Sequence, residues 1–230
     1  MSNQRENRIE DFAFEFIHSY YATRTGAKKI LVDKAERTKE GYLADGLFSL
    51  QNPDKSIFIA SLSTGNSSTI VRLLTAYKKR GISKMRYLTA ALLLALTFYT
   101  GVQVAKLSLL YAAPAAAAAV FVLHGYLERR GLKKKLGKLL DQMKKTPADE
   151  QWLGMSVSSL TFRGNVLAKH LLDLCERRGI GVITVGKRAK VVQLQEPKTQ
   201  TCRRGDFLAQ YEGEIRIRKT LLGDSYLRVA

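Results

Sequence analysis

The feature that most constrains this chain is an apolar stretch from Tyr87 to Leu127, which contains a single charged residue, Lys106. A helix that crosses a bilayer needs about 20 mainly apolar residues. The stretch can therefore supply two spanning helices that turn near residues 101–106. The alternative is a helical hairpin buried inside a soluble protein, and the charges that flank the stretch argue against it. We therefore predict a two-helix transmembrane hairpin.

Basic residues gather on both sides of this stretch. The whole chain has 38 Lys and Arg against 20 Asp and Glu, a formal net charge of +18. Fourteen of the cations lie between Lys78 and Lys145, where the acidic residues are Glu128 and Asp141. Because cytoplasmic flanks of spanning helices are rich in Lys and Arg, we expect two spans in the inner (cytoplasmic) membrane of a prokaryote, with both termini cytoplasmic. The same cations favour a lipid bilayer with anionic headgroups as a partner.

The second expected span is rich in small residues, since Pro114 is followed by five alanines, Ala115 to Ala119. Small side chains let helix backbones approach closely, so we expect this helix to pack against the first span, or to form a homo-oligomer or a larger membrane complex. Neither span contains an acidic residue, which argues against ion or proton transport. The N-terminal residues lack the apolar core of a signal peptide, so we expect the hairpin itself to direct insertion.

Hydrophobic periodicity predicts the elements on both sides of the hairpin. Before it we expect a helix over residues 8–22, strands at 29–32, 42–50 and 56–62, and a helix from Ser67 or Ser68. After it we expect a basic helix over 128–145, a strand within 153–162, a helix over 166–178, strands at 180–185 and 190–194, and a last strand at 214–217.

Neither side of the hairpin has enough strands to form a core alone. We therefore predict an α/β fold in which both sides contribute to one mixed sheet flanked by helices, with the hairpin inserted between two of its elements. The predicted parts are a first half of the domain (1–84), the transmembrane hairpin (85–127), a basic juxtamembrane helix (128–147), a second half (148–197) and a basic C-terminal extension (198–230).

Four segments resemble the restriction-endonuclease-like, or PD-(D/E)XK, superfamily, and most of all its type IV restriction-like branch. They are the opening helix IEDFAFEFI, the strand YLADGLFSL, the strand SIFIASLS and the helix–strand block LLDLCERRGIGVITV. The resemblance covers about residues 8–80 and 153–197. It implies a restriction-endonuclease-like fold.

The chemistry of that family implies an acid on each of two adjacent strands to hold Mg²⁺, and a Lys two residues after the second acid. Asp45 matches the first acid, whereas Ser61 and Ser63 stand at the positions of the second acid and the Lys. Glu10 or Glu15 would add an oxygen from the first helix. Because a hydroxyl cannot supply the charge that attracts Mg²⁺, we predict a degenerate site with no cofactor. The ordinary alternatives are a turn role for Asp45 and a solvated helix face for the two glutamates.

Basic residues late in the chain are candidates for nucleic-acid binding: Lys187, Arg188, Lys190, Arg203, Arg204, Arg216 and Arg218. The alternative is a solvated basic surface, or one that lies on anionic lipid. The leading hypothesis is a membrane-anchored, catalytically degenerate nuclease-like domain that acts as a nucleic-acid-binding or scaffold module. A second hypothesis is an accessory subunit of a membrane complex that binds only protein. A third is an active, Mg²⁺-dependent membrane-bound nuclease.

Overall fold

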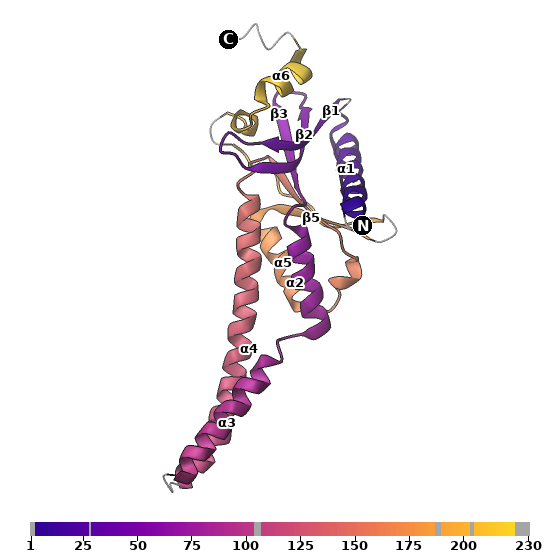
Figure 1. The fold of residues 1–230 in the computed structure, drawn as a ribbon. Helices are drawn as coiled ribbons and strands as arrows, with labels where there is room; N and C mark the ends of the chain where they lie inside the picture. Colours follow the sequence, from indigo (N-terminus) through magenta and orange to yellow (C-terminus); the bar gives the residue numbers. More distant parts are fainter. Residues whose placement is uncertain (1–2, 28, 104–106, 187–189, 203–204, 224–230) are drawn as a thin grey trace. The chain divides into compact units, whose positions relative to one another are not determined.

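The computed structural model describes residues 3–27, 29–103, 107–186, 190–202 and 205–223 (Figure 1). The chain divides into two compact units. The α/β unit comprises Met1–Leu74 and Gly137–Ala230, and the hairpin unit comprises Thr75–Leu136.

The α/β unit is built on a six-stranded mixed sheet in which the strands follow their order along the chain. They are β1 (Ile30–Arg37), β2 (Leu43–Gln51), β3 (Ile57–Ser63), β4 (Glu150–Met155), β5 (Ile180–Val185) and β6 (Val191–Gln195). The first three strands form an antiparallel meander, β3, β4 and β5 run parallel, and β6 is antiparallel to β5. Because β3 precedes and β4 follows the apolar stretch, their pairing brings both sides of the chain into one sheet.

One face of this sheet is covered by α1 (Asn3–Thr25), as Figure 1 shows. Ile17 and Tyr21 of this helix are fully buried, in the same cluster as Phe48 and Trp152. Apolar residues at intervals of three or four place one stripe of α1 against the sheet. The sheet residues in this cluster alternate along β2 and β3, as expected of strands with one face turned toward a helix.

The opposite face is covered by helices from three parts of the chain. The helix α5 (Val166–Arg178) packs against β5, and the helix α6 (Glu214–Leu222) and the 3-10 turn η2 (Phe207–Gln210) cover the end of the sheet near β2 and β3. The first turns of α2 (Ser67–Arg80) bury Ile70 and Leu74.

Two of the predicted strands are wrong in the structure. Residues 214–217 begin the helix α6, in which Ile217 is buried while Ile215 is exposed, and an Arg218–Glu214 pair at 3.0 Å supports the helical spacing. A four-residue segment cannot distinguish a strand from a helix by periodicity. The strand expected within 153–162 begins earlier and ends at Met155, and Leu160 lies exposed in the 3-10 turn η1 (Ser159–Thr161).

The hairpin unit contains α3 (Met85–Gln103) and the first part of α4 (Leu107–Met143), which lie side by side in Figure 1. Gly101, Ala113 and Ala117 are buried, so small residues allow the two helices to pack closely. The basic juxtamembrane segment is the continuation of α4 rather than a separate helix. The change from apolar to charged side chains does not interrupt the backbone hydrogen bonds of a helix.

Within the described residues, α3 is the one helix that is long and apolar enough to cross a membrane. The second span, expected over residues 107–127, does not meet that criterion, so the two-span hairpin stays a prediction. The large apolar side chains of α3 are exposed, with Leu92 at 64% and Phe98 at 55%. This exposure distinguishes α3 from the core helix of a soluble protein.

Candidate functional site

The structure brings together the three residues that the sequence placed at the centre of the candidate site. Asp45 lies on β2, and Ser61 and Ser63 lie on β3. The register pairs Gly46 with Leu62 and Leu47 with Ser61. Because side chains alternate along a strand, Asp45, Ser61 and Ser63 share the face of the sheet that is turned away from α1.

The Asp45 carboxylate is bound to the turn between β3 and α2. Its Oδ2 atom accepts hydrogen bonds from the backbone N–H of Thr64 at 2.6 Å and of Gly65 at 2.7 Å. A Cβ atom at Gly65 would lie 3.4 Å from both carboxylate oxygens, an ordinary van der Waals contact. Asp45 therefore satisfies two N–H groups that would otherwise lack a partner just before the helix begins.

A polar hollow of about 190 Å³ lies beside this carboxylate. It is lined by Leu43, Asp45, Ser63, Gly65, Asn66, Gln142, Met143 and Thr146. The Asn66 side-chain amide donates to Gln142 Oε1 at 2.9 Å across part of the lining. Apart from Asp45 the polar lining groups are neutral, so the hollow can hydrogen-bond a small polar group but has little charge with which to hold an ion.

These residues do not fit the Mg²⁺ site of the resembling family. That site uses an acid on each of two adjacent strands, whereas Asp45 is the single carboxylate in the hollow's lining and β3 has Ser61 and Ser63 at the other positions. One of the Asp45 oxygens already accepts two backbone hydrogen bonds. Within the described part of the chain, no three His, Cys, Asp or Glu side chains lie close enough to share a metal ion.

The two glutamates of the first helix do not join Asp45 in the described structure. Glu15 is exposed on α1, which covers the other face of the sheet. Glu10 also lies in α1, but its side chain is outside the described residues. The sheet therefore separates Glu15 from the polar hollow.

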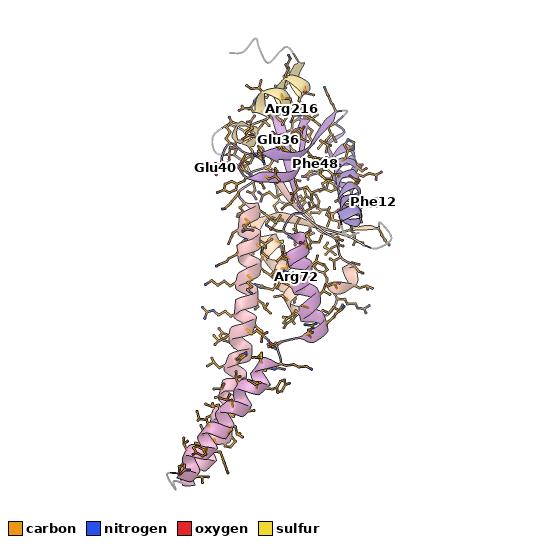
Figure 2. The ribbon with its side chains drawn as sticks, in the orientation of Figure 1. Phe12, Glu36, Glu40, Phe48, Arg72 and Arg216 are labelled. Atoms are coloured by element: carbon orange, nitrogen blue, oxygen red, sulfur yellow. The ribbon has the colours of Figure 1, made fainter. Side chains whose placement is uncertain are left out.

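Two of the candidate nucleic-acid-binding arginines contact carboxylates. Arg216 contacts Asp33 at 2.6 Å and Glu36 at 2.9 Å, and Figure 2 labels Arg216 and Glu36 in the same part of the α/β unit. Arg218 contacts Asp206 at 2.7 Å and Glu214 at 3.0 Å. Hydrogen bonding to Asp33 raises the pKa of Arg216. The pairs of Arg216 tie α6 to β1, and the pair of Arg218 with Asp206 joins α6 to the residue before η2, so both arginines have a structural role.

Five candidate cations remain. Lys190 is exposed, whereas Lys187, Arg188, Arg203 and Arg204 lie outside the described residues.

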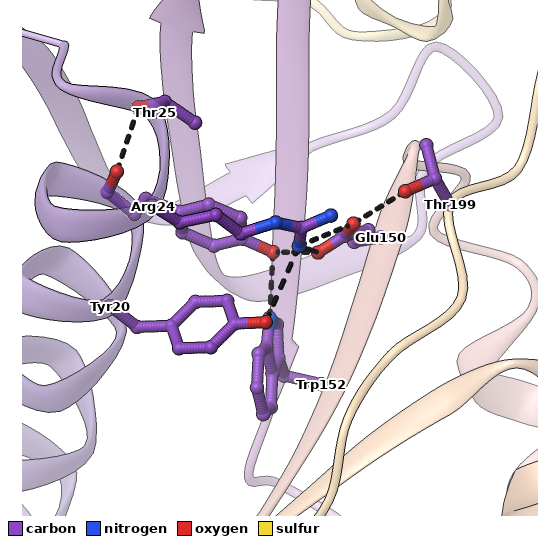
Figure 3. Close-up of polar contacts among 7 residues, drawn as sticks. Tyr20, Arg24, Thr25, Glu150, Trp152 and Thr199 are labelled. Carbon is purple, nitrogen blue, oxygen red and sulfur yellow. Dashed lines mark hydrogen bonds and ion pairs between the residues drawn. The ribbon is translucent and has the colours of Figure 1, made fainter.

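A buried carboxylate that sequence reasoning missed lies at the start of β4 (Figure 3). Glu150 is fully buried and accepts hydrogen bonds from the hydroxyls of Tyr21 and Thr199, both at 2.6 Å. Arg24 donates to its two oxygens at 2.9 and 3.0 Å. Trp152 Nε1 donates to the Tyr21 hydroxyl at 2.8 Å. We call these five residues the Glu150 network.

Each member of the Glu150 network forms a hydrogen bond with another member. Burial and the neighbouring Glu150 raise the pKa of the Tyr21 hydroxyl, which therefore remains a hydrogen-bond donor. A buried charge is tolerated when it is paired and hydrogen-bonded, and this arrangement joins α1 to the central strands. The signal available in the sequence was an acidic residue at the start of the apolar segment EQWLGM.

Comparison of the chain with family models, with curated proteins and with solved structures found no match. The function must therefore be inferred from the chemistry of the polar hollow, the pairing of the arginines and the exposed apolar helix.

Proposed function

We propose that this chain is a membrane-anchored, nuclease-like α/β module with a catalytically degenerate site, and that it acts as a scaffold at the cytoplasmic face. One observation carries the proposal: the carboxylate at the position of the first metal-binding acid, Asp45, shares a face of the sheet with Ser61 and Ser63 and is hydrogen-bonded to the β3–α2 turn. The acid that would bind metal is used to hold the backbone, and its neighbours are hydroxyls.

The anchor in this proposal is the hairpin, with α3 and residues 107–127 both crossing the bilayer and both termini in the cytoplasm. Exposed apolar side chains on the second helix support a second span, because Val122 is 70% and Leu123 55% exposed. The cations that flank both ends of the apolar stretch support the cytoplasmic placement.

A scaffold role is favoured over nucleic-acid binding by the ion pairs of Arg216 and Arg218. Binding to phosphates depends on cations that can exchange their small counterions for the nucleic-acid backbone. Carboxylates already neutralise both of these arginines. A phosphate would have to compete with four acidic side chains for the two guanidinium groups.

Cleavage assays test the degenerate site. The full chain, purified in detergent, is incubated with DNA or RNA and with Mg²⁺ or Mn²⁺, beside Asp45→Ala and the matched variant Asp54→Ala in the exposed β2–β3 turn. We expect no metal-dependent cleavage by any of the three. Cleavage by the unaltered chain that Asp45→Ala abolishes and Asp54→Ala retains would show an active nuclease and overturn the proposal.

A salt series tests whether the scaffold binds nucleic acid. DNA affinity is measured for the unaltered chain and for the variant with Arg203, Arg204, Arg216 and Arg218 all changed to Gln. We expect no salt-sensitive affinity near physiological ionic strength. An affinity that falls steeply with salt and is weakened by the four substitutions would instead assign the module to nucleic acid.

The accessory-subunit hypothesis is favoured by the apolar residues of α3 and α4 that remain exposed after the two helices pack, among them Tyr99 and Tyr126. In a membrane complex these residues would contact other spanning helices. Affinity purification in a gentle detergent tests this: co-purification of a stoichiometric membrane protein supports the subunit role, and recovery of the chain alone argues against it.

A further inference from the structure

Arg86 at the start of α3 lies beside two aromatic rings that contact each other. Its guanidinium carbon lies 5.0 Å from the centre of the Tyr87 ring and 4.7 Å from the centre of the Phe121 ring. The two rings are themselves 5.2 Å apart. Contacts of this kind attract a cation to the ring face, and a guanidinium that already rests against two rings loses less freedom when it binds a ligand.

Most of the hydrogen-bonding capacity of this guanidinium is unused. An arginine has five N–H donors, and within the described residues Arg86 makes one side-chain hydrogen bond, from Nη2 to the Tyr87 hydroxyl at 3.2 Å. Its Nε atom is buried and has no partner in the same part of the chain. The terminal N–H groups that do not contact Tyr87 therefore have no acceptor there.

Partly buried arginines elsewhere in the protein are neutralised by carboxylates. Arg178 contacts Asp141 at 2.7 Å, and Arg218 contacts Asp206 and Glu214. Arg86 is also partly buried, yet no carboxylate of the described residues lies within ion-pair distance of it. The nearby acid Glu128 instead accepts the backbone N–H of Ser83 at 2.9 and 3.1 Å. No carboxylate in the part of the chain that the structure describes therefore neutralises Arg86.

The position of Arg86 indicates what kind of anion would neutralise it. It is the second residue of α3, the helix able to cross a membrane, and aromatic residues such as Tyr87 favour the headgroup region at the end of a span. Lys84, Arg129 and Arg130 are exposed in the same unit, so the local charge is positive. Guanidinium groups bind phosphate with two parallel hydrogen bonds.

We propose that Arg86 binds the headgroup phosphate of an anionic glycerophospholipid at the cytoplasmic end of the hairpin. Tyr87 and Phe121 hold the guanidinium in place, and its terminal N–H groups donate to the phosphate oxygens. The inference rests on the membrane anchoring in the proposed function and identifies the class of lipid that the anchor recognises.

The test uses the full chain in nanodiscs of phosphatidylcholine, with or without a minor fraction of phosphatidylglycerol. Lipid that stays bound after release is identified by native mass spectrometry. Arg86→Gln removes the charge, Arg86→Lys keeps it without the planar fork, and Phe121→Leu removes one ring. The matched control is Arg80→Gln, which removes one exposed cation from the same unit. Circular dichroism checks that each variant keeps its helices.

We expect the unaltered chain and Arg80→Gln to retain phosphatidylglycerol in preference to phosphatidylcholine. Arg86→Gln and Arg86→Lys should each weaken retention about tenfold, the effect of losing a charge-assisted hydrogen bond, and Phe121→Leu should weaken it less. Equal retention by Arg86→Gln and the unaltered chain would overturn the proposal. So would an equal loss in Arg80→Gln, which would indicate diffuse attraction by the whole basic surface.

Three further outcomes identify which idea has failed. Displacement of the lipid by inorganic phosphate would assign the site to a soluble anion and overturn the lipid assignment. A chain that enters nanodiscs but shows no preference for phosphatidylglycerol overturns this inference and leaves the anchor intact. A chain that does not enter nanodiscs at all overturns the anchor and, with it, the lipid site.

Discussion

Glu150 is the side chain whose loss should affect the α/β unit most, because it accepts hydrogen bonds from three other residues while fully buried. We predict that Glu150→Ala lowers the free energy of unfolding by about 3 kcal/mol, since it leaves the Thr199 hydroxyl and Arg24 without their acceptor. Trp152 is the single tryptophan of the chain and belongs to the same network. Its fluorescence during urea unfolding in detergent measures the change.

The control for this prediction is an ion pair on the surface. Lys34 contacts Asp11 at 2.9 Å, and both side chains are more than 60% exposed. Exposed pairs contribute little, so Lys34→Gln should change the unfolding free energy by less than about 0.5 kcal/mol. A Glu150→Ala variant as stable as Lys34→Gln would contradict a stabilising role for the network.

Asp149 makes the stability of the α/β unit depend on pH. Burial raises the pKa of this carboxyl from 3.8 to about 6. The folded state therefore binds the proton more tightly than the unfolded state, so the contribution is complete below pH 3.8 and is lost as the pH rises through 6. We predict that the unfolding free energy of the unaltered chain falls, relative to that of Asp149→Asn, by about 1 kcal/mol over this range after allowance for solvent screening.

The measurement for Asp149 is urea unfolding at a series of pH values, again followed by Trp152 fluorescence. Asn keeps an oxygen that can accept the backbone N–H of Ile59, which Asp149 Oδ2 accepts at 2.8 Å. The comparison therefore isolates the titration from the loss of the hydrogen bond. Parallel pH profiles for the two proteins would contradict the prediction.

At the scale of elements, α5 depends on its N-cap. The Asn165 side-chain oxygen accepts from the N–H of Leu167 at 3.1 Å and of Ala168 at 3.3 Å, and its amide donates to the carbonyl of Leu74 at 3.0 Å. We predict that Asn165→Ala lowers the free energy of unfolding by about 2 kcal/mol, the upper part of the range for losing a cap, because the hydrogen bond to the Leu74 carbonyl is lost as well. Thermal unfolding followed by circular dichroism measures this.

Asn165→Asp separates the two roles of the cap. An aspartate still caps the helix and suits the positive end of its dipole, but it cannot donate to the Leu74 carbonyl. We expect Asn165→Asp to lower the free energy of unfolding, but by less than Asn165→Ala does. If Asn165→Asp is as destabilising as Asn165→Ala, the bond to Leu74 rather than the cap is what stabilises α5.

At the scale of the whole molecule, the α/β unit is made of two segments that are far apart in the sequence. The parallel pair of β3 and β4 joins Ala60–Ser63 to Glu150–Leu153. If β3 and β4 were separated, each would expose an unpaired sheet edge. The apolar side chains that bury each other across the pair would be exposed as well. We therefore predict that fragments 1–80 and 130–230 copurify when they are expressed together, and that each aggregates when expressed alone.

Size-exclusion chromatography and the emission maximum of Trp152 measure the outcome. A buried tryptophan emits at shorter wavelength, so only the mixed fragments should show native-like emission. A soluble, folded 1–80 fragment would contradict the prediction, because it would mean that the β1–β3 meander and α1 form a core without β4.

Local signals were sufficient for several elements. Asn165 and Gly179 mark the two ends of α5 because an N-cap side chain and a left-handed residue act on the neighbouring backbone. The apolar run over residues 180–185 forms β5 with the predicted bounds. The apolar composition of α3 similarly identified a helix able to cross a membrane. The sequence assigned Asp45, Ser61 and Ser63 to two neighbouring strands, but the register that puts them on one face of the sheet came from the structure.

Tertiary structure alone decided the partners of charged groups. Tyr21 and Glu150 are 129 positions apart, and Arg216 and Asp33 are 183 apart. Periodicity describes which face of an element is apolar, but not which distant side chain that face meets. For this reason the sequence identified Arg216 and Arg218 as cations available to a ligand, whereas the fold pairs both with carboxylates. It also explains why the N–H groups that donate to Asp45, and the absence of a described carboxylate beside Arg86, emerged only when the chain was folded.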